Sequence, residues 1–136
     1  MNKIITATKP NNFGIFPYEL QENQTLTLSC SAYVGGPKGN IKIWKLARNS
    51  TTNVLIFTAN TSDIKTENCS EFINANFTYT VSRDDNGAIF QCSSHNVLNK
   101  EAGPSLESPN RVSVICKLKM LFVCCLCIVY SVSFKI

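Results

Sequence analysis

The sequence predicts an all-β domain, an antiparallel sandwich or barrel, and two observations support this prediction. Short segments alternate between apolar and polar residues, which is the pattern of strands buried on one face. Between them lie stretches such as YVGGPKGN and LARNSTTN, whose residues favour turns. No segment before residue 117 shows a convincing apolar stripe with a period of 3.6 residues. Short strands separated by turns at this spacing are typical of antiparallel sandwiches.

The predicted strands follow one another along the chain. In TLTLSCSA, Leu26, Leu28 and Cys30 share one face, and in AIFQC, Phe90 and Cys92 share another. FTYTVS and RVSV alternate in the same way. The strand segments are TLTLSCSA (25–32), NIKIWKL (40–46), FTYTVS (77–82), AIFQC (88–92) and RVSV (111–114).

The segment NIKIWKL leaves its orientation open. Ile41 and Ile43 lie on one face of the strand, and Lys42, Trp44 and Leu46 lie on the other. If Trp44 points into the core, Ile43 points outward. It is then either covered by neighbouring side chains or offered to a partner.

Three spaced residues suggest a particular sandwich. Cys30 on one strand, Trp44 fourteen residues later and Cys92 on a later strand resemble the immunoglobulin fold. The resemblance implies a disulfide between Cys30 and Cys92 that packs against a core tryptophan. It is closest to the C2 or I set of cell-surface adhesion proteins.

The stretch RDDNGAIFQC resembles the corner motif of this family, D-x-G/A-x-Y-x-C, with two departures. Asn86 stands at the position of the acid, with Asp85 one place early, and Phe90 stands at the position of the tyrosine. Ala88 and Cys92 match the motif. Phe90 has no hydroxyl for the usual hydrogen bond, so the resemblance implies a hydrophobic corner in which its ring fills the same core site.

The resemblance covers residues 17–116 and divides the chain into three parts. We expect an N-terminal extension (1–16), an immunoglobulin-like domain (17–116) and an apolar tail (117–136). Closing a loop of about 62 residues by a disulfide stabilises a domain by about 4 kcal/mol in the chain-entropy model. We therefore expect an oxidising compartment.

The tail contains MLFVCCLCIVYSVSF, fifteen residues without a charge, with lysines on both sides. As a helix it would span roughly 22 Å, short of the ~30 Å hydrocarbon core. We expect a truncated membrane anchor, a tail without function, or a buried strand. The first twenty residues contain no apolar run of seven or more, so a secretory signal is not predicted. We then expect either that the signal is missing from this gene sequence or that the chain is a fragment of a larger protein.

Charge and motifs argue against several function classes. The net charge is +4, but three lysines of the last twenty residues leave about +1 on residues 1–116, so a nucleic-acid site is not expected. His95 is the one histidine, and no serine or cysteine near it has the context of a nucleophile. Asp84 and Asp85 fit a turn. We expect no enzyme activity, no metal and no cofactor.

Other cysteines and the asparagines fit an extracellular glycoprotein. Cys69 and Cys116 form a second disulfide, remain free thiols or link to another chain. Five N-x-S/T triplets occur where chance gives about two or three. The predicted glycosylation sites are Asn23, Asn49, Asn60, Asn68 and Asn76.

These features predict a cell-surface adhesion or receptor module that binds another protein, including another immunoglobulin-like domain. The alternative is a secreted binding protein of immune or inhibitory type. The predicted contacts lie on the sheet that holds Trp44 and Cys92 and on its end loops. The contact residues are Ile43, Lys45, Gln91, Ser93 and His95.

Overall fold

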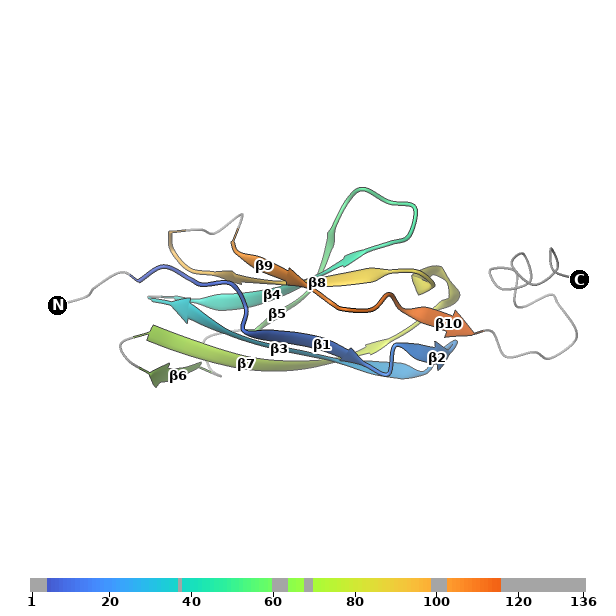
Figure 1. The fold of residues 1–136 in the computed structure, drawn as a ribbon, viewed down its shortest axis with the longest axis horizontal. Coiled ribbons are helices and arrows are strands. Elements are labelled where there is room, and N and C mark those ends of the chain that lie inside the picture. Colours follow the sequence, from blue (N-terminus) through green and yellow to red (C-terminus); the bar gives the residue numbers. More distant parts are fainter. Residues whose placement is uncertain (1–4, 37, 60–63, 68–69, 99–102, 116–136) are drawn as a thin grey trace, which may run out of the picture.

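The computed structural model describes the chain apart from residues 1–4, 37, 60–63, 68–69, 99–102 and 116–136. The described residues form two layers of β-sheet, as Figure 1 shows. The predicted all-β, immunoglobulin-like sandwich is therefore confirmed, whereas the apolar tail lies outside the described residues. Within the part described, no helix is long and apolar enough to span a membrane.

The first sheet has the order β1-β3-β7-β6 and is antiparallel throughout. The second has the order β5-β4-β8-β9 and is also antiparallel. A parallel pair, β2 and β10, forms a third, two-stranded sheet. The strands are β1 (Asn12–Phe16), β2 (Glu19–Gln21), β3 (Thr25–Gly35), β4 (Asn40–Leu46), β5 (Val54–Ala59), β6 (Ile64–Glu67), β7 (Ser70–Thr80), β8 (Ile89–His95), β9 (Ser105–Glu107) and β10 (Ser113–Ile115), and a 3₁₀ turn, η2 (Arg83–Asp85), precedes β8.

A disulfide joins the two large sheets. Cys30 on β3 is bonded to Cys92 on β8, with their Cα atoms 6.6 Å apart. Leu26, Leu28 and Phe90 are fully buried beside it, as the alternating patterns predict. The predicted disulfide and the core position of Phe90 are therefore confirmed.

Strand β4 has the opposite orientation to the one predicted. Ile41 and Ile43 are fully inside the core, and Ile43 lies opposite Cys92. Trp44 is only partly buried and lies on the outer face. The prediction of a core tryptophan is wrong because two β-branched apolar side chains fill the core from one face of β4. On the other face of β4, the N–H group of the Trp44 indole has a hydrogen-bond acceptor.

The sandwich begins before Pro17, so the boundary predicted there needs correction. Strand β1 pairs with β3, with Phe13 opposite Cys30. Further upstream, Ile5 and Gly36 form a bridge, and Asn96 Nδ2 donates to the carbonyl oxygen of Ile5 at 2.6 Å. Residues 5–16 thus belong to the packed domain instead of to a separate extension.

Candidate protein-binding face

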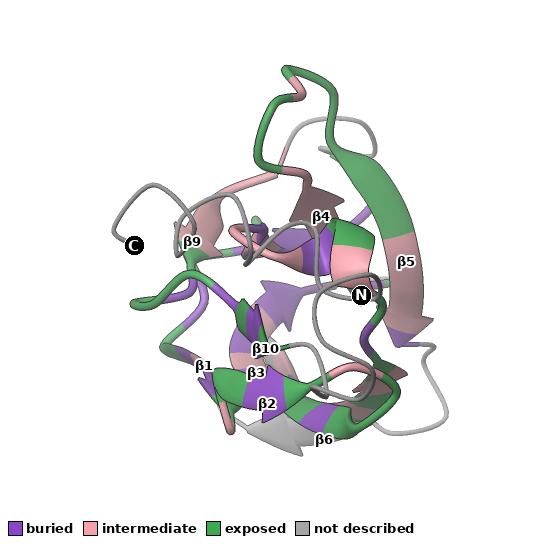
Figure 2. Cartoon of the chain, turned by 90° about the vertical axis from the view of Figure 1, so that its right-hand side faces the viewer, coloured by how far each residue is buried: buried purple, intermediate pink, exposed green. Residues whose placement is uncertain are grey.

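The outer face of the β5-β4-β8-β9 sheet carries side chains in two rows across the strands. Residues directly opposite one another in antiparallel strands share a face. One row runs through Thr58, Lys42, Ser93 and Ser105, and the next through Leu55, Trp44, Gln91 and Glu107. Leu55 is 44% exposed, and Figure 2 shows the exposed start of β5. This face therefore presents an aromatic and an aliphatic side chain among polar neighbours.

Trp44 is fixed by hydrogen bonds on this face. Its Nε1 donates to Ser93 Oγ at 2.9 Å, and Ser93 Oγ lies 2.6 Å from His95 Nε2. Ser93 and His95 are almost fully buried. These contacts hold the indole in one orientation, so little side-chain freedom remains to be lost on binding.

A shallow hollow of about 280 Å³ lies beside Trp44. In the wall of this hollow, Gln91 Nε2 donates a hydrogen bond to Ser105 Oγ at 3.0 Å. Asn53 and Gly103 complete the lining together with Ser93 and His95. Amide and hydroxyl groups around an indole offer donors and acceptors to a partner.

The predicted contact residues divide into two groups. Gln91, Ser93 and His95 line the hollow on the outer face, although the side chains of Ser93 and His95 have little exposure. Ile43 is buried and Lys45 points between the sheets, so neither can touch a partner from this face. Both corrections follow from the orientation of β4.

Sequence reasoning missed Leu55 and Glu107 because it missed their strands. VLIFTA in β5 is a nearly continuous apolar run without alternation, and β9 has only three residues. A short apolar run bounded by turn residues was the available signal for β5.

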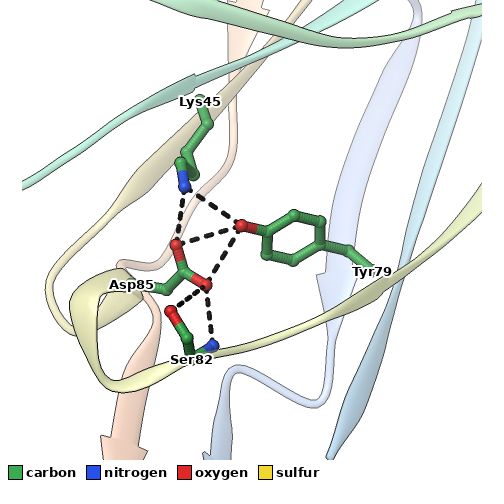
Figure 3. Close-up of polar contacts among 4 residues, drawn as sticks. All are labelled: Lys45, Tyr79, Ser82 and Asp85. Atoms are coloured by element: carbon green, nitrogen blue, oxygen red, sulfur yellow. Dashed lines mark hydrogen bonds and ion pairs between the residues drawn. The ribbon is translucent and has the colours of Figure 1, made fainter. Parts of the chain in front are cut away.

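Lys45 belongs to a partly buried polar cluster on the inner side (Figure 3). Its Nζ lies 2.7 Å from Asp85 Oδ1 and 3.0 Å from the hydroxyl of Tyr79. The Tyr79 hydroxyl donates to the Asp85 carboxylate, and the backbone N–H of Ser82 donates to Asp85 Oδ2 at 2.9 Å. Asp85 is only 1% exposed. The cluster ties β4, β7 and η2 together.

This cluster replaces the hydrophobic corner that the sequence suggested. Phe90 fills the core, as expected, and the ring of Tyr79 packs edge-on against it with centroids 5.6 Å apart. Tyr79 supplies the hydroxyl that Phe90 lacks. Asn86 caps another strand, because its Oδ1 accepts the backbone N–H of Val114 at 3.0 Å.

The cluster predicts loss of stability at alkaline pH. Desolvation acts to lower the pKa of Lys45, but its hydrogen bonds to Asp85 and Tyr79 leave that pKa above its ordinary value of 10.5. Burial raises the pKa of Tyr79 above its ordinary value of 10.0. The contribution of Lys45 and Tyr79 to stability is therefore complete at pH values below the pKa values that they have in the unfolded chain. This contribution is lost as the pH rises through the raised values of the folded protein.

We therefore expect the free energy of unfolding to fall as the pH rises above about 10, as measured by urea denaturation. Tyr79→Phe removes one of the two titrating groups, so its curve should fall less steeply. A stability that stays constant or rises over this range in the unmodified protein would contradict the assignment.

The two-layer fold with its inter-sheet disulfide defines an immunoglobulin-like domain. A family model described as a CD80-like C2-set immunoglobulin domain matches residues 16–102, and the chain belongs to this family. A comparison with curated proteins finds no match.

Similar chains are found among the solved structures at low sequence identity. The full ectodomain (Ig1–Ig3) of mouse nectin-like molecule 4 is 16% identical with a TM-score of 0.51, and the match covers 84% of this chain and 36% of that one. A chain from a structure on T cell specificity and activation by the bacterial superantigen toxic shock syndrome toxin-1 is 10% identical, with a TM-score of 0.46 and coverage of 80% and 99%. Rst D1-D2 is 15% identical, with a TM-score of 0.43 and coverage of 79% and 50%. The chain thus spans about a third of the length of the nectin-like ectodomain.

Proposed function

We propose that this domain is a recognition module of a cell-surface adhesion or receptor protein. It binds another protein, an immunoglobulin-like domain being the preferred class, through the outer face of the β5-β4-β8-β9 sheet. The observation that carries the proposal is the partly exposed Trp44, hydrogen-bonded in place beside Leu55 and a polar hollow. Tryptophan is enriched among the residues that dominate binding energy at protein interfaces.

The charges around this face support a protein partner. Lys42 lies two residues before Trp44 on the same face of β4, and Glu107 lies opposite Gln91 on β9, so both charges lie around the apolar pair of Trp44 and Leu55. An apolar centre with a polar rim is the usual anatomy of a protein interface. The rim charges favour a partner with complementary charges and set the orientation in which it docks.

The predicted glycans favour this face over the opposite one. Asn76 is exposed on β7, on the outer face of the first sheet, where Ser29 Oγ donates to its Oδ1 at 2.6 Å. Asn23 and Asn49 lie between strands, and Asn60 and Asn68 lie outside the described residues. Among the described residues, no sequon asparagine falls on β5, β4, β8 or β9. A glycan on Asn76 would cover the first sheet and leave the proposed binding face open.

A binding assay with surface variants tests the proposal. The multimerised chain is applied to a panel of cells that each display one immunoglobulin-type ectodomain, and bound fluorescence identifies a partner. Trp44→Ala and Leu55→Ser should each weaken that binding by about tenfold or more. Thr27→Ala/Asn74→Ala, on the exposed face of the other sheet and outside the predicted sequons, is the matched control and should bind normally.

Stability measurements separate binding from folding in this assay. Leu55 is 44% exposed, so Leu55→Ser should leave the unfolding midpoint nearly unchanged. If the variants of the first sheet lose binding while Trp44→Ala and Leu55→Ser keep it, the proposed face is wrong.

A further inference from the structure

Two adjoining hollows lie at the end of the sandwich that carries η2 and β10. Figure 1 shows β10 at this end of the fold. Their volumes are about 560 Å³ and 540 Å³. Arg48, Asn49 and Asn86 line both hollows and therefore form their common wall. Arg83 lines the first hollow and Arg111 the second. This end is separate from the proposed binding face.

Gly87 brings two of the arginines to one turn. Its φ is +84°, and a Cβ atom there would lie 2.8 Å from Cδ of Arg48, so the stem of Arg48 packs where a side chain would otherwise stand. Arg111 Nη1 donates to the carbonyl oxygen of Gly87 at 2.9 Å. Arg48 and Arg111 therefore both lie against Gly87.

The lining of the hollows is positively charged. Asp84 is the one acid among the described lining residues, against the three arginines. Arg83 is paired with Glu22 at 3.3 Å, whereas no ion pair within the described residues involves Arg48 or Arg111. Guanidinium groups without an ion-pair partner are suited to bind oxyanions, because their planar donors match sulfate and carboxylate.

We propose that the two hollows bind an acidic, sulfated polysaccharide. Sulfate groups pair with Arg48 and Arg111, and the amide and hydroxyl side chains of Asn86 and Ser113 bind sugar hydroxyls. Two joined hollows provide room for more than one sugar unit, which a single inorganic anion would not need. The described lining residues include no aromatic side chain on which a nucleic-acid base would stack. This proposal does not depend on the proposed protein-binding face.

The test uses a heparin hexasaccharide, its desulfated counterpart and inorganic sulfate, each titrated against the full chain by calorimetry. The sulfated hexasaccharide should bind, with an affinity that falls as salt rises, and the other two should not. Arg48→Gln/Arg111→Gln should weaken binding by about tenfold or more. Lys9→Gln/Lys38→Gln removes the same net charge from other exposed positions and should keep most of the affinity.

Asn49 begins a sequon, so the titration is repeated with Asn49→Gln, which removes a glycan from the shared wall. Failure of both forms to bind the sulfated hexasaccharide overturns the proposal. So does an equal loss in the arginine and lysine variants, because binding would then depend on net charge alone. The arginine variant should still bind the partner of the Trp44 face, which keeps the two proposals distinguishable.

Discussion

Removal of the inter-sheet disulfide, in Cys30→Ala/Cys92→Ala, is expected to reduce the free energy of unfolding by about 4 kcal/mol. The bond closes a loop with a sequence separation of 62 residues, and its loss restores the freedom of that loop in the unfolded chain. Each alanine also leaves a space beside fully buried neighbours such as Ile43. Domains have about 5–15 kcal/mol in total, so this loss removes much of the stability.

Urea denaturation without reductant measures this loss. Cys124→Ser/Cys125→Ser is a suitable control, because it also replaces two cysteines and leaves the inter-sheet bond intact. The control should unfold at the same urea concentration as the unmodified chain. A loss below about 1 kcal/mol in the disulfide variant would mean that sheet packing alone holds the domain together.

The sequence predicted the centre of the sandwich well because the strands there alternate. Strands β3 and β7 and the first half of β8 each have one buried face, and a period of two residues reveals it directly. The peripheral strands gave weaker signals. β2, β9 and β10 have three residues each, and β5 is an apolar run that fits several structures.

The main error was the predicted orientation of β4, because it placed two buried or inward-pointing residues, Ile43 and Lys45, in the predicted binding site. NIKIWKL alternates, but either face could be apolar, because Ile41 and Ile43 compete with Trp44 and Leu46. The family resemblance favoured the tryptophan. Packing favours the isoleucines, which are fully buried, and Ile43 lies opposite Cys92 of the disulfide. The sequence alone does not reveal this packing between the sheets. The residues predicted from β4 therefore point inward, whereas those predicted from β8 line the hollow on the outer face.

The acid before the predicted corner shows why a displaced motif residue can be informative. Asp85 stands one place before the usual acid, and this shift points its carboxylate at Lys45 and Tyr79. Lys45 lies inside for the same reason that Trp44 lies outside, since neighbouring residues of a strand face opposite sides. The inward position of Lys45 and the outward position of Trp44 therefore have one structural cause.

Breaking this cluster by Lys45→Met is expected to destabilise the domain by about 3 kcal/mol. Asp85 is 1% exposed and would lose its ion-pair partner, because Nζ of Lys45 lies 2.7 Å from its Oδ1. The bonds from Tyr79 and Ser82 remain and place the loss at the lower end of the range for buried pairs. The side chain of methionine fills a similar volume, so the change reports mainly on charge.

A double-mutant cycle tests whether the cost comes from the pair itself. Asp85→Asn keeps the shape of the side chain and removes its charge, so Lys45→Met/Asp85→Asn leaves no buried charge without a partner. The double variant should therefore lose clearly less stability than the sum of the two single variants, by urea denaturation near neutral pH. Additivity to within about 0.5 kcal/mol would show that Lys45 and Asp85 act independently, and the hydrogen bonds to Tyr79 and Ser82 would then account for the stability of this corner.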